Sequence, residues 1–350
     1  MLLLGAIVSL VISFYLLAEI SDKYFVVSLD KISHRLGMSH DMAGATLMAI
    51  GSSAPELFVA LIAVFKPGGH AMIGVGTIVG SALFNLLVIV GVVGLVKKST
   101  LTWQPVVRDL LFYIMAIAAL YFVLKNGKIS MLEAAGFILL YGLYVWAVMY
   151  WRKWFKYELT DEDPEEDEDE PKTGLMRIFV PFDVLLKFIF PRPKYYFTIF
   201  TISILFISML CWVLVESAII ISHTLEIPEV VIALTVLAVG TSVPDMMSSV
   251  IVAKQGRGGM AVSNGIGSNI FDIFVGLGLP WLIKSYLVGS DLVTDSTGLE
   301  ISIALLFGSV LLMLLVLMWR KWRLGHGLGF FLIMLYVMYI IYEIVKLYLS

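Results

Sequence analysis

Charged residues and cysteines are both scarce in this sequence of 350 residues. Asp, Glu, Lys and Arg make up 15% of the chain, whereas a soluble domain carries about 25%. The single cysteine, Cys211, excludes an intrachain disulfide and a metal cluster built on cysteines. Hydrophobic residues reach 60%, and apolar runs of roughly 20 residues, long enough to cross a bilayer, recur along the chain. The composition predicts an all-α polytopic membrane protein, and the net charge of −3 gives no indication of nucleic-acid binding.

The apolar runs predict ten transmembrane helices. The first run, Leu2 to Ala18, has neither a basic flank nor a small-residue cleavage site, so we expect it to be a span and not a signal peptide. The expected spans are 2–18, 42–65, 72–96, 106–124, 130–150, 197–221, 228–253, 260–283, 299–319 and 327–347.

The distribution of basic residues predicts the orientation. With the N-terminus outside, 19 of the 24 Lys and Arg residues fall in inner loops and only five in outer ones. Basic residues concentrate on the inner side of membrane proteins. We therefore expect an outer N-terminus and a multi-pass protein of the plasma or inner cell membrane.

A polar stretch divides the chain into two halves of five expected spans. Residues 1–151 form the first half, 152–196 a cytoplasmic loop, and 197–350 the second half. Within the loop, 158–170 carries ten carboxylates and is expected to be solvated. Residues 174–190 have the pattern of an amphipathic helix lying on the inner membrane surface.

The two halves contain matching motifs. "TLMAIGSSAPEL" (46–57) aligns with "TVLAVGTSVPDM" (235–246), and "GSALFNLLVIVG" (80–91) aligns with "GSNIFDIFVGLG" (267–278). The motifs extend over 43–91 and 232–281. An odd number of spans in each half inverts the second half in the membrane. This inverted five-helix repeat is typical of secondary transporters, whose site lies at the membrane midplane.

The motifs place carboxylates inside apolar spans without basic partners. Glu56, Asp245 and Asp272 have no Lys or Arg within the four repeat helices. A charge in a membrane span costs about 3 kcal/mol or more, so a bound cation is the expected partner. Pro55 and Pro244 break the helices, and we expect this to free carbonyls near Ala49, Ile50, Ala238 and Val239.

The candidate ligands are all oxygens. Asn85 and Asn269 offer amide oxygens, and no His or Cys lies in these segments. Hard cations such as Ca²⁺ and Na⁺ suit oxygen ligands, whereas Zn²⁺ and Cu favour nitrogen or sulfur. The hydroxyl candidates are Ser52, Ser53, Ser81, Thr241, Ser242 and Ser268. Ca²⁺ and Na⁺ competing for the same carboxylates would produce antiport, because the empty, negatively charged carrier would rearrange less readily than the loaded one.

These motifs resemble the two repeats of the cation/Ca²⁺ exchanger superfamily. The resemblance implies Na⁺/Ca²⁺ exchange by alternating access, with Glu56 and Asp245 as the central Ca²⁺ carboxylates and Asn85 and Asp272 completing the cluster. It also implies that the hydroxyl candidates, together with Ala49 and Ala238, serve flanking Na⁺ sites or Ca²⁺ through side-chain or main-chain oxygens. The Glu/Asp/Asp set and "SVIVAKQGRGGMAVS" resemble the K⁺-dependent members, which implies K⁺ as a third transported ion.

Other functions stay open on the sequence alone. A Ca²⁺/H⁺ exchanger would use protons in place of Na⁺, although the Asn-rich motif usual in such proteins is absent and the many hydroxyls favour Na⁺. A cation channel would not need an inverted repeat. An intramembrane hydrolase would need His or Cys beside the acids. We expect a non-enzyme without a cofactor, whose partners are Na⁺, Ca²⁺, K⁺ and the lipid bilayer, with no nucleic acid or protein partner indicated.

Overall fold

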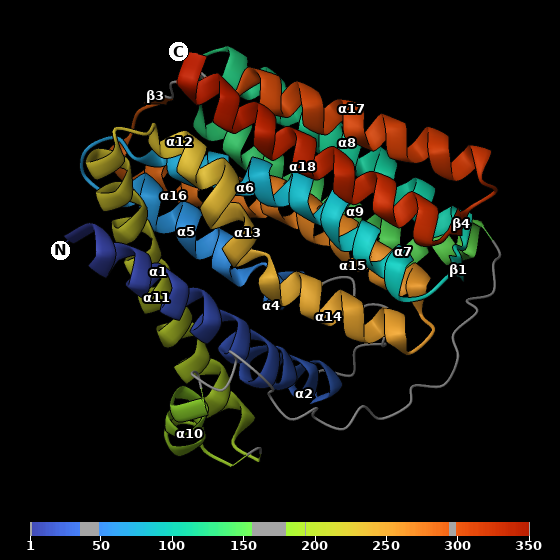
Figure 1. The fold of residues 1–350 in the computed structure, drawn as a ribbon, viewed down its shortest axis with the longest axis horizontal. Helices are drawn as coiled ribbons and strands as arrows, with labels where there is room; N and C mark the ends of the chain where they lie inside the picture. Colours follow the sequence, from blue (N-terminus) through green and yellow to red (C-terminus); the bar gives the residue numbers. More distant parts are fainter. Residues whose placement is uncertain (1, 36–48, 156–179, 193, 294–298, 350) are drawn as a thin grey trace.

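The computed structural model describes residues 2–35, 49–155, 180–192, 194–293 and 299–349, and these are almost entirely helical (Figure 1). Segments labelled η are turns of π-helix. The first half contains α1 (Leu2–Ile20), η1 (Ser21–Val26), α2 (Val27–Arg35), α4 (Ala49–Ser52), α5 (Ala54–Phe65), α6 (Ala71–Phe84), η3 (Asn85–Ile89), α7 (Val90–Val96), α8 (Trp103–Lys125) and α9 (Met131–Trp154). The rest contains α10 (Val180–Ile189), α11 (Tyr196–Leu225), α12 (Glu229–Ile232), η5 (Ala233–Leu237), α13 (Ala238–Thr241), α14 (Val243–Lys254), α15 (Gly258–Phe271), η6 (Asp272–Leu277), α16 (Gly278–Val288), α17 (Glu300–Trp319) and α18 (His326–Leu349).

Within the described ranges, eight helices are long and apolar enough to cross a membrane, which confirms the all-helical membrane architecture. Glu229–Thr241 and Val243–Lys254 form a further pair, bent by 41°. The expected span 42–65 is described only from Ala49 onward, as α4 and α5. The ten-span count and the outer N-terminus therefore stay predictions. The eight helices are Leu2–Leu29, Ala71–Val96, Trp103–Lys125, Met131–Trp151, Tyr196–Leu225, Gly258–Val288, Glu300–Trp319 and His326–Leu347.

The first helix is longer than expected. We predicted an end at Ala18, but helical backbone continues through η1 and α2 to Arg35. No Gly or Pro occurs in this stretch to end a helix, and a salt bridge from Lys23 to Glu19 at 2.9 Å spans the predicted boundary. The Lys and Arg residues assigned to the first inner loop thus lie on a helix.

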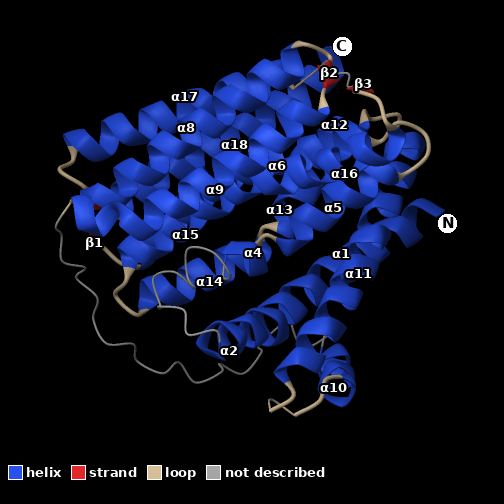
Figure 2. Ribbon diagram, turned by 180° about the vertical axis from the view of Figure 1, so that it is seen from behind, coloured by secondary structure: helices blue, strands red, loops and turns tan. Residues whose placement is uncertain are grey.

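Two short antiparallel strand pairs lie at opposite ends of the helix bundle (Figures 1 and 2). β1 (Ser99–Thr100) pairs with β4 (Arg323–Leu324), and β2 (Lys128–Ile129) pairs with β3 (Leu292–Val293). β1 and β3 follow corresponding helices of the two halves, α7 and α16. Corresponding connections at opposite ends of the molecule are what an inverted repeat requires.

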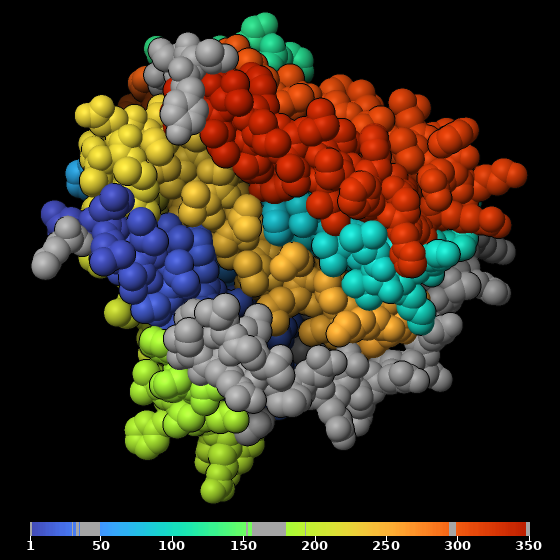
Figure 3. Space-filling model, in the orientation of Figure 1, coloured from blue at the N-terminus to red at the C-terminus, as the bar shows by residue number. Residues whose placement is uncertain are grey.

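The helices pack around two hydrophobic clusters. The larger one joins the central helices α6 and α15 to α8, α9, α17 and α18. The smaller one joins α1 and α11 to α5 and η5, and α1 and α11 lie side by side (Figures 1 and 2). In the space-filling view, residues of α12 to α14 separate α1 from α18 on the visible face (Figure 3).

The amphipathic helix expected at 174–190 is present from Val180 to Ile189 as α10; residues 174–179 and the acidic stretch 158–170 lie outside the described residues. Its inner face packs on α1, where Tyr15 donates a hydrogen bond to Asp183 at 2.5 Å. Phe190, which follows the helix, stacks on Tyr24 at 3.9 Å between ring centroids. Phe188 on the opposite face is 90% exposed. Its position on the membrane surface stays a prediction.

Glycine permits a close helix crossing at the centre of the molecule. A Cβ atom on Gly80 of α6 would lie 2.2 Å from the Leu234 carbonyl oxygen of η5 and 2.6 Å from the Ala238 Cβ. Both neighbours belong to the backbone or are rigidly attached to it, so neither can yield without separating the helices. Small residues serve this purpose at helix contacts in membranes.

Gly80→Ala should therefore lower the unfolding free energy by about 1–3 kcal/mol, the usual cost of overpacking. Gly136→Ala in α9 is the matched control, because a Cβ there meets no heavy atom within 4 Å. Thermal unfolding in detergent measures both. Equal midpoints for the two variants would contradict the close crossing.

Candidate functional site

Four segments that correspond in the two halves meet at the site. Ser53 and Ser242 interrupt the helices before Pro55 and Pro244 with nearly identical backbone angles, φ −91° and ψ 9° against φ −87° and ψ 4°. The predicted double helix break is thus observed. It places Glu56 in the first turn of α5 and Asp245 in the first turn of α14.

The second pair of motifs places polar residues at matched π-helical turns. Asn85 begins η3 and Asp272 begins η6, each directly after a conventional helix. Single π-helical turns inside α-helices occur frequently at functional sites. Asn85 and Asp272 have no exposed surface, and the same is true of Glu56 and Asp245.

Hydrogen bonds connect the acids across the two halves. Ser242 of the second half donates to Glu56 Oε1 at 3.2 Å, and Asn85 Nδ2 of the first half donates to Asp245 Oδ2 at 3.0 Å. Within the second half, Ser268 also donates to Asp245 Oδ1 at 3.2 Å. These contacts bring together side chains that are 23 to 186 residues apart in sequence.

Several buried oxygens in the same place have no hydrogen-bond partner in the described part of the chain. They are Glu56 Oε2, Asn85 Oδ1, Ser53 Oγ and both carboxylate oxygens of Asp272. No ion pair to Lys, Arg or His is recorded for Glu56, Asp245 or Asp272 among the described residues. Unsatisfied buried polar atoms are rare and costly. Several buried oxygens without a hydrogen-bond donor could instead coordinate a hard cation.

The three acids do not form one compact cluster. Asp272 lies within electrostatic range of Glu56 and Asp245, and its carboxylate is near the Ser53 hydroxyl without completing a hydrogen bond. Within the described ranges, no three Asp, Glu, His or Cys side chains converge closely enough to hold one ion. An ion held by Glu56 and Asp245 would therefore also need hydroxyl, amide or carbonyl oxygens, and the assignment of Asp272 to the same cluster stays a prediction.

Asn269, which we predicted to offer an amide oxygen to the ion, uses this oxygen in a hydrogen bond within the site. Its Oδ1 accepts a hydrogen bond from Asn85 Nδ2 at 3.0 Å. Its Nδ2 donates to the Ala82 carbonyl and to the Tyr113 hydroxyl, both at 3.1 Å. Asn269 thus supports Asn85 and leaves Asn85 Oδ1 as the unpartnered amide oxygen.

The remaining predicted ligands lie around this centre in two groups. Ser52 and Ser268 approach each other at 3.4 Å between hydroxyl oxygens, which joins α4 to α15. Ser81 and Thr241 donate to carbonyls of their own helices, at 3.0 Å to Ile78 and 3.1 Å to Leu237. Their oxygen lone pairs stay available to a cation, because a donating hydroxyl still accepts.

The Ala238 carbonyl, which we predicted to be freed, still accepts a long hydrogen bond from the Ser242 amide at 3.3 Å. The Thr241 hydroxyl also lies 3.5 Å from this oxygen, but its one proton has a closer acceptor in Leu237, so a lone pair of the Ala238 oxygen stays available. The helix break falls at Ser242, one turn after Ala238. The backbone hydrogen bond between these two residues is therefore long but still present. Ala49, its counterpart, begins α4.

Sequence reasoning missed a polar group on α8 beside the site. We assigned Arg108 to an inner loop, but it is buried and pairs with Asp109 at 2.8 Å. Asp109 also accepts a hydrogen bond from Tyr144 at 3.2 Å. Asp109 falls inside the predicted span 106–124. An acid within an apolar run could therefore have indicated this buried polar group from the sequence.

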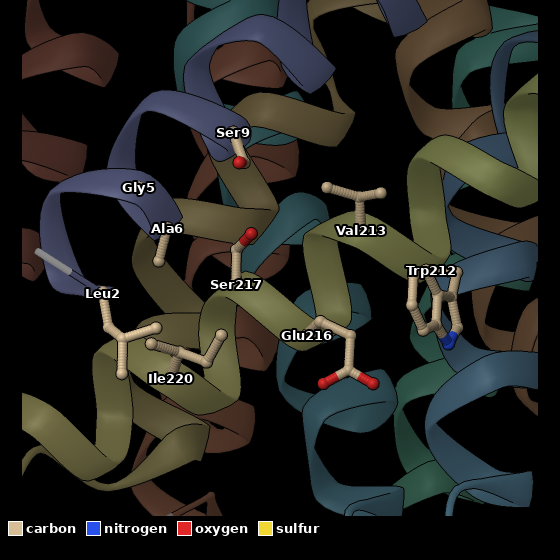
Figure 4. A pocket seen from close by; sticks show the side chains of 9 residues that line it. All are labelled: Leu2, Gly5, Ala6, Ser9, Trp212, Val213, Glu216, Ser217 and Ile220. Carbon is tan, nitrogen blue, oxygen red and sulfur yellow. The ribbon is translucent and has the colours of Figure 1, made fainter.

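A groove of about 560 Å³ lies elsewhere, between the beginning of α1 and the second half of α11 (Figure 4). Its polar residues are Ser9, Ser217 and Glu216, and Glu216 is paired with Lys66. None of the predicted ion ligands lines it.

Comparison with known proteins identifies the family. The family model described as "Sodium/calcium exchanger protein" matches residues 6–150 and 195–345. The chain belongs to this family. Human sodium/potassium/calcium exchanger 5 is 34% identical over 95% of this chain and 82% of that protein. Human sodium/potassium/calcium exchanger 4 is 30% identical over 95% of this chain and 79% of that protein.

The fold of the family is also shared. A structure of the sodium-calcium exchanger NCX_Mj soaked with 100 mM Na⁺ and 10 mM Sr²⁺ superposes with a TM-score of 0.58. The match covers 96% of this chain and 97% of that one at 22% identity. The resemblance inferred from the motifs is therefore confirmed at the level of the exchanger family.

The two kinds of buried acid in this exchanger predict stability changes of opposite sign. Asp272→Asn removes a charge that has no partner among the described residues, which should raise the unfolding free energy by about 1–3 kcal/mol in ion-free buffer. Asp109→Asn breaks the buried ion pair with Arg108, which should lower it by about 3–5 kcal/mol. Thermal unfolding at pH 8 in choline chloride measures both. A destabilised Asp272→Asn variant would mean that this carboxylate has a stabilising partner.

Proposed function

We propose that this chain is a secondary antiporter that exchanges Na⁺ for Ca²⁺ by alternating access. The observation that carries the proposal is the set of unpartnered oxygens around Glu56 and Asp245 at the junction of the two halves. Membership of the sodium/calcium exchanger family supports it. The strand pairs at opposite ends of the bundle support an inverted repeat, in which one half moves against the other around a fixed site.

The proposed Ca²⁺ site centres on Glu56 and Asp245. Ca²⁺ takes six to eight oxygen ligands, and two carboxylates together with neighbouring hydroxyl and amide oxygens supply that kind of set. Asn85 contributes its unpartnered Oδ1. We assign Ser53, Ser81, Thr241, Ser242, Ser52, Ser268, Ala49 and Ala238 to flanking positions that serve Na⁺ or complete the Ca²⁺ shell.

Exchange follows from the charge of this site. Without a cation, the ionised acids would repel one another in a buried place where no basic side chain of the described residues pairs with them. One Ca²⁺ or several Na⁺ neutralise the same groups, so each ion set excludes the other. Moving the two halves past the site is favourable only when its charge is neutralised, and this couples the two fluxes.

Asp272 is the proposed K⁺-linked group. The human relatives named above are called sodium/potassium/calcium exchangers. Both carboxylate oxygens of Asp272 are unpartnered in the described structure, and no three acids there are close enough to share one ion. A separate carboxylate can bind a further monovalent cation beside Ca²⁺ without competing for the same oxygens.

Glu56→Gln should reduce Na⁺-driven Ca²⁺ uptake into proteoliposomes to near background. Losing one charged ligand costs about 1.5–3 kcal/mol, or about 10- to 150-fold in affinity. Ca²⁺ should also raise the melting temperature of the wild type and not of this variant, because only a protein that binds the ion is stabilised by it.

Asp291→Asn is the control for that experiment, because Asp291 is an exposed acid outside the repeat motifs. Wild-type uptake by Glu56→Gln would sink the site assignment. Uptake driven by a proton gradient without Na⁺ would replace the proposal with Ca²⁺/H⁺ exchange. Flux that does not saturate and needs no counter-ion would replace it with a channel.

Asp272→Asn should remove K⁺ dependence and retain Na⁺-dependent Ca²⁺ uptake. An amide at this position matches its counterpart Asn85 and lacks the charge that would hold K⁺. Uptake is measured with K⁺ present or absent at clamped voltage, for the wild type and the variant. Wild-type uptake that ignores K⁺ would contradict K⁺ co-transport; equal K⁺ stimulation of both proteins would contradict the role of Asp272.

A further inference from the structure

A tyrosine outside both repeat motifs contacts the support of the proposed ion ligand Asn85. Tyr113 of α8 is completely buried. Its hydroxyl donates to the Ala82 carbonyl at 3.2 Å and accepts from Asn269 Nδ2 at 3.1 Å. Asn269 Nδ2 also donates to the Ala82 carbonyl at 3.1 Å. Three helices, α6, α8 and α15, are thereby joined at one point next to the site.

These contacts determine which way the Asn269 amide points. A carbonyl accepts and never donates, so the NH₂ group of Asn269 must face Ala82. Because the Tyr113 proton is directed to the same carbonyl, the tyrosine oxygen can accept the second amide proton of Asn269. The Oδ1 atom of Asn269 consequently points the other way, toward Asn85 Nδ2 at 3.0 Å.

The orientation of Asn269 in turn determines that of Asn85. The NH₂ group of Asn85 faces two acceptors, Asn269 Oδ1 and Asp245 Oδ2, each at 3.0 Å. Its Oδ1 is left on the opposite side, buried and without a partner in the described residues. If Asn85 rotated by half a turn, its oxygen would face two acceptors and its NH₂ group would face the position proposed for the cation.

We propose that Tyr113 is a positioning residue for cation binding: with Asn269 it holds the Asn85 amide so that the oxygen, and not the NH₂ group, is presented to the ion. This inference rests on the proposed function, since it assigns Asn85 Oδ1 to the transported cation. Tyr113 itself does not contact the ion.

Tyr113→Phe removes one of the two acceptors of the Asn269 NH₂ group and keeps the ring in place. The half-saturating Ca²⁺ concentration for Na⁺-driven uptake should rise about 3- to 10-fold, as expected for one buried hydrogen bond, with the maximal rate within about twofold of wild type. Tyr336→Phe is the matched control, because its buried hydroxyl has no hydrogen-bond partner in the described structure. It should leave the half-saturating concentration unchanged.

A double-mutant cycle separates positioning from general packing. In an Asn269→Leu background the amide that Tyr113 orients is gone, so Tyr113→Phe should add nothing to the loss that Asn269→Leu causes alone. A packing effect of Tyr113 would instead persist in both backgrounds, and additive losses would overturn the inference. If Tyr113→Phe fails to yield monodisperse protein, Asn269→Leu alone carries the test, and unchanged Ca²⁺ affinity in that variant would overturn the inference.

Glu56→Gln, measured in the same preparation, keeps the two claims apart. Wild-type uptake by Glu56→Gln means that the proposed site is wrong, and the positioning role falls with it. Inactive Glu56→Gln together with wild-type affinity in Tyr113→Phe overturns the positioning role alone. Inactive Glu56→Gln together with a raised half-saturating concentration in Tyr113→Phe supports both.

Discussion

Negative charge buried without a basic partner is the constraint on which this structure depends. Glu56, Asp245 and Asp272 have no exposed surface, and none of them pairs with a Lys or Arg among the described residues. Such groups are costly in a membrane protein. The surrounding hydroxyls and amides satisfy some of their oxygens and leave others open. A cation bound at the proposed site would satisfy the open oxygens, and this is the property that an ion carrier needs.

The two halves satisfy this constraint differently. The first half supplies the Asn85 amide, which donates to Asp245 of the second half. Its counterpart Asp272 carries no amide protons and, when ionised, cannot do the same for Glu56. It instead adds a third charge within electrostatic range. A duplicated scaffold thus carries an asymmetric set of ligands. This single difference between Asn and Asp is the physical basis for expecting an additional monovalent ion beside Ca²⁺.

Local chemistry explains why much of this was predictable. Pro55 and Pro244 cannot continue a helix ladder wherever they occur, and the observed breaks at Ser53 and Ser242 follow directly. Seven of the predicted spans agree with single observed helices to within five residues at each end, and 228–253 agrees in the same way with the bent pair Glu229–Thr241 and Val243–Lys254. The end predicted at Ala18 was wrong, because the polarity of the following residues indicated a loop although nothing in them ends a helix.

Tertiary contacts explain what could not be predicted. The sequence places an amide at Asn269, but which of its two ends faces the site depends on Ala82 and Tyr113, which come from other helices. The same holds for the Ala238 carbonyl, whose availability depends on where within one turn the helix breaks. Comparison of the two repeat motifs predicts which kinds of ligand atom are present, because each half must supply its own polar side chains. Their orientation is set by residues such as Tyr113 that lie outside the motif, and motif comparison alone does not reveal these.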